Sequence, residues 1–379
     1  MLWDMRRRLT SWNSLVPFIA LVALVFTWGR DLANVLTTVV VLLLGGAVLS
    51  AVHHAEVIAH RVGEPLGSLV LAVAVTVIEV GLIVTLMISA DGGKPTLARD
   101  TVFAAVMITC NGIVGASLFA ATRRGTVAVF NADGAGGALA TVASLATLTL
   151  VLPTFTTSTP GPTFSSQQLT FAAISSLVLY GIFVFVQTVT DRESFMPALK
   201  LGSGDAAHAG SAQGDSQATN IHETPLPTSR ELWTSATLLV VSLVAVVGLA
   251  KVVSPTIESG VKSAGLPVSF VGVVIALIVL LPETLSAVRG ARRGLIQTSF
   301  NLAYGSAMAS IGLTIPAIAF ASIWLSGPLH LGLGTTEIVL LALTVIVSVL
   351  TVARGRATLL QAGVHLALFA AFLELALNP

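Results

Sequence analysis

The sequence predicts an all-α polytopic membrane protein with eleven transmembrane helices. Three observations lead to this prediction. Hydrophobic residues make up 55% of the 379 residues, and charged residues only 10%. A soluble domain does not need so much apolar surface, whereas a chain that crosses the bilayer repeatedly does. The apolar residues also gather in runs of roughly 20, the length that spans a hydrocarbon core as a helix.

Eleven apolar segments have this length. The first half of the chain contains six, at 14–29, 33–52, 66–90, 102–121, 137–153 and 169–190. The second half contains five, at 232–252, 266–288, 298–325, 336–353 and 357–377. Residues 6–8 are three arginines before the first apolar run, but no small-residue cleavage site follows, so we interpret this run as a retained helix and not a signal peptide.

Between the halves lies a stretch rich in Gly, Ser, Ala, Gln and Asp, with almost no large apolar residue over 202–224. This composition predicts a flexible linker. The predicted organisation is therefore an N-terminal extra transmembrane helix (1–31), a first repeat (32–190), a cytoplasmic flexible linker (191–230) and a second repeat (231–379).

The positions of Lys and Arg predict the orientation. With the N-terminus in the cytoplasm and the eleven spans alternating, 14 of the 19 Lys and Arg residues face the cytoplasm and 5 face outside. This is the positive-inside bias of multi-pass proteins. The sequence thus predicts a bacterial inner (cytoplasmic) membrane protein with a cytoplasmic N-terminus.

The two halves resemble each other as inverted repeats. Gly63-Glu-Pro leads into a helix that contains Glu79, and Gly265-Leu-Pro leads into a helix that contains Glu283. Because each repeat has an odd number of spans, the second copy enters the membrane in the opposite direction. Inverted repeats are typical of secondary transporters, whose binding site lies near the bilayer midplane between the repeats.

Glu79 and Glu283 are the central candidates for function. A carboxylate within a membrane span is costly and is by default a functional hypothesis. Pro282 precedes the second acid and removes a backbone N–H, which leaves a carbonyl free nearby. Carboxylate and carbonyl oxygens suit a hard cation such as Ca2+. Two facing carboxylates without a cation would hold at least one proton, so the pair predicts competition between cation and protons.

Polar residues near the acids are candidates for the rest of the site: Thr76, Asn111, Ser306 and Ser310. Thr76 lies three residues before Glu79, on the same helix face. Ser and Thr in membrane helices usually bond to their own backbone, so each hydroxyl has a purely structural alternative. Asn111 is a stronger candidate, since an amide in hydrocarbon needs a partner.

Other polar residues favour structural roles. His365 and Glu374 fall in the last span, and we expect packing for His365, with a proton relay as the alternative. His53, His54, Glu56 and His60 cluster between the second and third spans at the cytoplasmic face, where a solvated loop is favoured over a pH or cation sensor. The single cysteine, Cys110, excludes an intrachain disulfide, and we expect it to be a small buried hydrophobic residue.

These motifs resemble the calcium/cation antiporter superfamily, and within it the bacterial calcium/sodium–proton antiporters of the ChaA type. The resemblance rests on Ala74-Val-Thr-Val-Ile-Glu79, Met107-Ile-Thr-Cys-Asn-Gly112, Leu280-Leu-Pro-Glu283-Thr and Asn301-Leu-Ala-Tyr-Gly-Ser-Ala-Met-Ala-Ser310. It implies a ten-helix core of two inverted repeats plus one N-terminal helix, and export of calcium, sodium or potassium in exchange for protons. It also implies that Glu79 and Glu283 are the repeat acids, with Ser306, Ser310 and Asn111 at the polar positions.

The chain departs from the pattern of calcium–proton exchangers in this superfamily. Thr76 and Leu280 stand where those proteins have asparagine, and Thr284 stands where they have histidine. Val106-Met107 replaces the Gly-Ser pair of the first repeat. Fewer polar ligands leave the preference between calcium and monovalent cations open.

The sequence therefore predicts a secondary transporter that exchanges cytoplasmic Ca2+, with Na+ or K+ as further candidate cations, for external protons by alternating access. It is expected to need no cofactor and not to be an enzyme. Its expected partners are membrane lipid, the transported cations and protons, with no nucleic acid; the oligomeric state stays open. A mainly monovalent Na+ or K+/H+ antiporter and a passive cation channel are alternatives. An intramembrane metalloprotease would need a His-rich zinc motif or an aspartate pair in the spans, which the sequence lacks.

Overall fold

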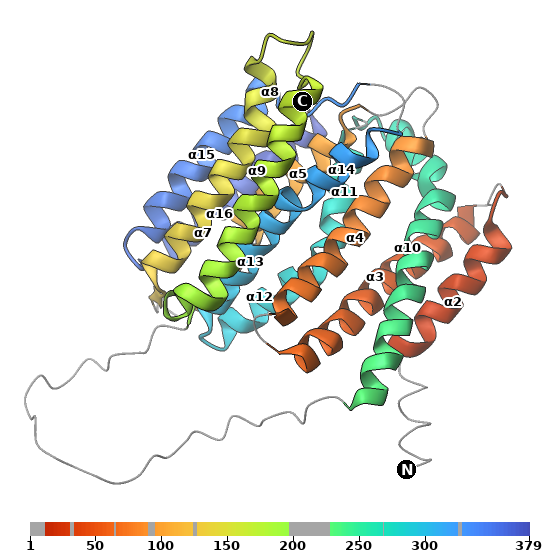
Figure 1. Cartoon of the computed structure of the whole chain (residues 1–379), viewed down its shortest axis with the longest axis horizontal. Coiled ribbons are helices and arrows are strands. Elements are labelled where there is room, and N and C mark those ends of the chain that lie inside the picture. The colour runs from red at the N-terminus through yellow and green to blue at the C-terminus, as the bar shows by residue number, and fades with distance from the viewer. Residues whose placement is uncertain are drawn as a thin grey trace, which may run out of the picture.

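The computed structural model describes residues 12–30, 34–63, 66–89, 95–123, 127–196, 228–267, 269–324 and 328–379, and these are almost entirely helical (Figure 1). The first half contains α2 (Trp12–Thr27), α3 (Asn34–Val62), α4 (Leu66–Ser89), α5 (Leu97–Met107), η1 (Ile108–Ile113), α6 (Val114–Thr122), α7 (Ala132–Ala146), η2 (Thr147–Val151), α8 (Leu152–Phe155), α9 (Ser166–Phe185), η3 (Val186–Thr190) and η4 (Arg192–Phe195). The second half contains α10 (Ser229–Ser263), α11 (Phe270–Val279), α12 (Leu281–Arg292), α13 (Ile296–Gly312), α14 (Thr314–Ala321), α15 (Thr335–Val352) and α16 (Leu359–Leu377).

The long helices have the length and composition of membrane spans. Among the described residues, 9 helices qualify singly, and α11 with α12 would make a tenth as a pair bent by 54°. Helix α2 is apolar but only 16 residues long. The all-α polytopic fold is thus confirmed, while the exact number of eleven spans stays a prediction.

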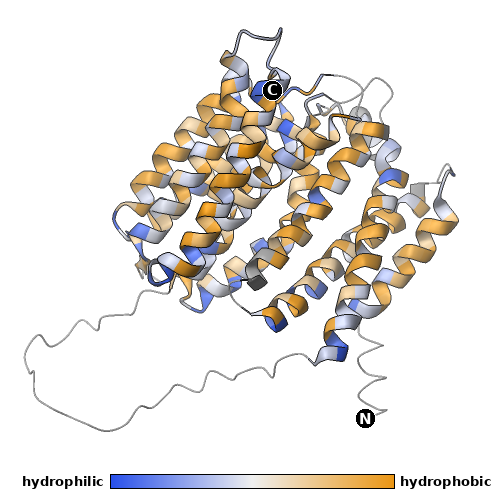
Figure 2. Cartoon of the chain, viewed as in Figure 1, coloured by the Kyte–Doolittle hydropathy of each residue, from blue (hydrophilic) through white to orange (hydrophobic). Residues whose placement is uncertain are grey.

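The helix ribbons carry hydrophobic colours over most of their length (Figure 2), and many large apolar side chains are exposed. Val25, Phe171 and Leu350 are each at least 65% exposed, as expected for helices that face hydrocarbon. The chain is therefore a multi-pass membrane protein.

Helices α2, α3 and α10 pack together at one side of the molecule, and α4 joins them to the larger bundle (Figure 1). The packing there depends on glycine: a Cβ on Gly81 of α4 would come within 2.6 Å of Val247 on α10. Small residues allow such close helix contacts in a membrane, where dispersion replaces the hydrophobic effect as the main attraction.

The helices that carry the two acids run in opposite directions (Figure 1). Glu79 lies on α4, and Glu283 lies just after the break at Leu280 between α11 and α12. The proline explains the break, because Pro282 lacks an N–H and fits best in the first turn of the new helix. Glu283 is thereby in the first turn of α12, where the helix dipole favours a negative charge.

Two features of the loops differ from the prediction. Most of the predicted linker, residues 197–227, lies outside the described residues, but residues 192–195 form η4 and belong to the folded body. Phe195 packs edge-on against Phe183 of α9, with ring centroids 5.7 Å apart. In addition, β1 (Ala128–Val129) pairs antiparallel with β2 (Arg356–Ala357), which ties a loop of each half together.

Candidate cation site

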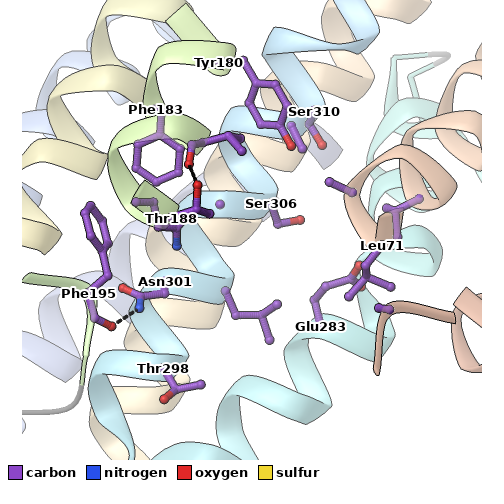
Figure 3. A pocket seen from close by; sticks show the side chains of 18 of the residues that line it. Leu71, Tyr180, Phe183, Thr188, Phe195, Glu283, Thr298, Asn301, Ser306 and Ser310 are labelled. Carbon is purple, nitrogen blue, oxygen red and sulfur yellow. Dashed lines mark hydrogen bonds between the residues drawn. The ribbon is translucent and has the colours of Figure 1, made fainter. Parts of the chain in front are cut away.

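A cavity of about 450 Å³ lies between the two halves. It extends to the end of the bundle where α3 ends and α9 gives way to η4, since Ala59 and Arg192 are among its lining residues. Its walls come from α3, α4, α9, η3, η4, α12 and α13, and the polar side chains among them are those of Thr76, Tyr180, Gln187, Thr188, Arg192, Glu283, Thr298, Asn301, Ser306 and Ser310. Figure 3 shows Glu283, Ser306 and Ser310 around this space, with Tyr180 and Phe183 of α9.

Glu79 lies in the middle of α4 with its side chain only 2% exposed. Its Oε2 accepts hydrogen bonds from the hydroxyl of Ser310 (3.0 Å) and from the hydroxyl of Thr314 (3.2 Å), both of the second half. Its Oε1 is buried and has no hydrogen-bond partner among the described residues. A buried carboxylate oxygen without a partner is costly, so this atom is a place for a proton or a cation.

Glu283 lines the cavity and is 6% exposed. Its Oε2 is likewise buried without a hydrogen-bond partner in the described parts of the chain. Glu283 interacts electrostatically with two other carboxyls, those of Glu56 and Glu79. The two acids of the repeats therefore belong to one electrostatic environment, and each has one unsatisfied oxygen.

Three of the predicted ligands gather with these acids. Thr76, Ser306 and Ser310 line the cavity together with Glu283, and Ser310 bonds directly to Glu79. Glu79 itself does not line the cavity; it lies behind Ser310. A cation that enters from the open end would thus meet Glu283 and the hydroxyls first, and reach Glu79 past Ser310.

Asn111, by contrast, does not line the cavity. It lies in the π-helical turn η1 and is fully buried, and its amide nitrogen donates to the hydroxyl of Thr344 (2.9 Å). Its carbonyl oxygen contacts Nδ1 of His365 at 3.2 Å. In this arrangement α15 and α16 supply the partners that a buried amide needs, so the structure does not bring Asn111 together with the two acids, and its role as a ligand stays a prediction.

Sequence reasoning missed Thr314, the second donor to Glu79. The signal was present: Ser306, Ser310 and Thr314 repeat every four residues, which puts three hydroxyls on one face of a helix. Within the predicted span 298–325, the structure has a break at Leu313, where α13 ends, and Thr314 begins α14.

Asn301 is a further cavity residue that sequence reasoning did not single out. Its amide nitrogen donates to the carbonyl of Phe195 (2.6 Å), and its oxygen accepts from Gln297 (2.9 Å) (Figure 3). The bond to Phe195 joins η4 to α13, and the bond within α13 orients the amide of Asn301.

Comparisons with known proteins agree with this architecture. The sequence profile of the sodium/calcium exchanger protein family matches residues 32–189 and 234–378. The chain is 43% identical to y4hA of Sinorhizobium fredii, described as an ionic transporter, over 97% of this chain and 96% of that protein. It is 34% identical to the sodium-potassium/proton antiporter ChaA of Escherichia coli, over 94% and 93% of the two chains.

Solved structures show the same fold. The crystal structure of the H+/Ca2+ exchanger CAX superimposes with a TM-score of 0.67 at 15% identity, covering 95% of this chain and 86% of that one. The structure of native YfkE gives a TM-score of 0.65 at 15% identity, covering 95% and 96%. The chain therefore belongs to the sodium/calcium exchanger protein family, as a multi-pass membrane protein of the cation-antiporter type.

Proposed function

We propose that this protein exchanges cytoplasmic Ca2+, Na+ or K+ for external protons by alternating access, with Glu79 and Glu283 as the groups that bind either the cation or the protons. The observation that supports this most directly is the pair of buried, unpartnered oxygens, Glu79 Oε1 and Glu283 Oε2, beside a cavity that is open at one end. Each oxygen needs a proton or a metal ion to offset its burial.

Coupling follows from this requirement. If the site is empty and deprotonated, two carboxylates are buried without compensation, so the bare site is unfavourable. A cation that binds both acids displaces their protons, and protons that return displace the cation. The protein then changes between its inward-open and outward-open conformations more readily with a cation or protons bound than with the site empty. This is the property that couples the two fluxes in an antiporter.

The donor set bears on the choice of cation. Besides Glu283, hydroxyl-bearing residues such as Thr76, Ser306 and Ser310 line the cavity, and the amide of Asn301, also in the lining, is already bonded to Phe195 and Gln297. Ca2+ takes six to eight oxygens, roughly, so water would have to supply several of them. This scarcity, and the 34% identity to a sodium-potassium/proton antiporter, support a mainly monovalent exchanger as the second candidate.

The charge distribution supports a cavity that faces the cytoplasm of the bacterial inner membrane. Arg61 at the end of α3, Arg192 in η4 and Arg292 at the end of α12 all belong to the end of the bundle at which the cavity opens. Positive residues stay on the cytoplasmic side during insertion. In this proposal the N-terminus is cytoplasmic, the cavity is the entrance for cytoplasmic cations, and the protein catalyses no covalent chemistry.

The test is exchange in everted membrane vesicles that carry an internal pH dye. Adding Ca2+, Na+ or K+ outside should release protons from the lumen, and the order of the three half-maximal concentrations identifies the substrate. Glu79→Gln and Glu283→Gln should each abolish the signal, since a glutamine can neither exchange a proton nor neutralise a cation. Glu374→Gln is the matched control, because Glu374 bonds only Asn378 at the end of α16.

Two results would contradict the proposal. One is full exchange by either glutamine variant at normal membrane abundance. The other is cation flux through the wild-type protein without any change in pH, which would indicate a passive channel.

A further inference from the structure

The residues that line the cavity include two charged side chains, one of each sign. Glu283 is only 6% exposed, whereas Arg192 of η4 is exposed at the end of the cavity where α9 gives way to η4. In Figure 3, Phe195 of the same short helix lies across the space from Glu283. A guanidinium stays protonated throughout the physiological pH range. A cation that enters from this end therefore passes a positive charge before it reaches the negative one.

The charge of Arg192 is not neutralised by an ion pair. In the described part of the chain, Arg99 and Asp100 form an ion pair, but Arg192 forms none. Its neighbours Asp191 and Glu193 are exposed, and neither lines the cavity. The positive-inside rule accounts for an arginine near the cytoplasmic face, but not for its place in the cavity wall. Arg192 is therefore the charged group of this segment that borders the path of the cation.

The segment that carries Arg192 is fixed to the bundle by contacts of its neighbours. The amide of Asn301 on α13 donates to the carbonyl of Phe195 (2.6 Å). The backbone of Ser194 packs so closely on Gly134 of α7 that a Cβ there would clash with it. Neither contact uses the side chain of Arg192. A substitution of Arg192 should therefore change the charge of the cavity wall and leave η4 in place.

We propose that Arg192 is a determinant of cation specificity, which makes the cytoplasmic entrance less favourable for divalent than for monovalent cations. A Coulomb energy is proportional to the charge of the ion. At the same place in the cavity, the guanidinium thus repels Ca2+ twice as strongly as Na+ or K+. This inference deepens the proposed function and rests on it, because it concerns the cation that enters the cavity and reaches Glu283.

Without Arg192, the charges of the site would favour the divalent ion. The same proportionality makes the attraction of the carboxylates for Ca2+ twice their attraction for Na+. An unpaired positive charge in the wall subtracts from this advantage. Because the guanidinium is exposed at the entrance, it does so without occupying a position beside the buried oxygens of Glu79 and Glu283.

The first experiment compares wild-type protein and Arg192→Gln in everted vesicles, where the cytoplasmic face is in contact with the medium. The half-maximal concentrations of Na+ and Ca2+ for proton exchange should both fall, and the factor for Ca2+ should be the square of the factor for Na+. At low ionic strength we expect about twofold for Na+ and about fourfold for Ca2+. Equal factors for the two ions, or no change for either, would overturn the proposal.

Two further variants separate charge at the cavity from other effects. Arg192→Lys keeps the charge on a side chain of different shape, so it should behave like wild type. Arg292→Gln removes an equal charge from the end of α12, where it does not line the cavity, and should leave both concentrations unchanged. Shifts as large in Arg292→Gln as in Arg192→Gln would indicate the general potential of the cytoplasmic face and refute a specific role.

Ionic strength provides a test within each variant. Raising choline chloride in the medium from about 10 mM to about 1 M shortens the Debye length from about 30 Å to about 3 Å. The difference between wild type and Arg192→Gln should then largely disappear, because an exposed charge is screened. A difference that persists would indicate a structural effect of the substitution and contradict the proposal.

A measurement without transport distinguishes failure of this inference from failure of the proposed function. Thr298 lines the cavity and is exposed, so Thr298→Cys in a Cys110→Ala background places a single thiol there. Its rates of reaction with a cationic and an anionic methanethiosulfonate reagent report the potential in the cavity. Adding Arg192→Gln should raise the ratio of the cationic to the anionic rate at least about twofold. An unchanged ratio refutes the role of Arg192 even if exchange is confirmed, whereas a raised ratio supports it even if no proton exchange is found.

Discussion

The hydroxyl of Ser310, on α13 of the second half, donates a 3.0 Å hydrogen bond to Glu79, on α4 of the first half. This bond joins the two repeats at the inner end of the cavity, since Ser310 also lines that cavity. It makes Ser310 the contact through which cation binding in the cavity would be communicated to the deeper acid.

Ser310→Ala should weaken cation binding and leave the maximal rate of exchange largely intact. A hydrogen bond to a charged group contributes about 1.5–3 kcal/mol, so the half-maximal cation concentration should rise about tenfold or more. The half-maximal cation concentration is measured by cation–proton exchange in vesicles. Ser322→Ala is the control, because the hydroxyl of Ser322 bonds the backbone carbonyl of Ala319, one turn back in the same helix. An unchanged half-maximal concentration for Ser310→Ala would argue against a role in the site.

Ser310 and Thr314 should act on Glu79 together. Both donate to the same oxygen, Oε2, so removal of one leaves the other as a partial substitute. We expect Thr314→Val alone to have the smaller effect, because its bond is longer, and the double variant to lose more than the sum of the single losses. A double-mutant cycle on the half-maximal cation concentration measures the coupling, and strict additivity would mean that the two hydroxyls do not share Glu79.

Asn111→Ala should lower stability without weakening cation binding from the cytoplasmic side. The substitution removes the partners of Thr344 and His365 in a fully buried network, at a cost of about 1–3 kcal/mol for each polar group left unsatisfied. Thermal unfolding of the purified protein should shift to lower temperature, while the half-maximal cation concentration changes by less than about twofold. A rise of about tenfold in the half-maximal cation concentration would instead indicate that Asn111 binds the cation.

Gly272→Ala should destabilise the contact between α11 and α5. A Cβ at this position would come within 2.9 Å of the backbone nitrogen of Thr101, which cannot move aside as a flexible side chain could. Overpacking of this kind costs about 1–3 kcal/mol, seen as a lower unfolding temperature. Gly137→Ala on α7 is the matched control, since its Cβ would meet nothing within 4 Å. Equal unfolding temperatures for the two variants would contradict the close contact between α11 and α5.

Ser306→Cys should report which side of the membrane the cavity faces. In a Cys110→Ala background, the new thiol would be the only one in the chain, because Cys110 is the single cysteine. A membrane-impermeant maleimide should label it from the cytoplasmic side, and a cysteine at the fully buried Ser348 should react at least about tenfold more slowly. Labelling of Ser306→Cys from the outside alone would reverse the proposed orientation.

Much of the architecture could be predicted from the sequence. Apolar runs of spanning length, the break that Pro282 introduces before Glu283, and the bias of Lys and Arg are local properties, and each follows from the cost of exposing polar groups to hydrocarbon. The acids stood out for the same reason. Their hydroxyl neighbours Thr76, Ser306 and Ser310 were found because they lie on the same helices or on a motif with regular spacing.

Other features depend on which helices meet. Asn111 and Ser310 look alike in sequence, as polar residues at matching positions of two repeats, yet Ser310 reaches Glu79 while Asn111 is held by α15 and α16. No pattern within either segment distinguishes them. The difference arises because Ser310 borders the cavity, whereas around Asn111 side chains of α16 pack against Gly112 of η1 and Gly115 of α6.

The sequence by itself determined that this chain crosses a membrane many times and carries an acid in a span of each half, because desolvation makes both properties visible residue by residue. Only the tertiary structure decided that the cavity lies beside α9, that Thr314 shares Glu79 with Ser310, and that His365 lies in a closed polar network. These are contacts between segments distant in the chain, and the free energy of such contacts depends on packing that no single segment encodes.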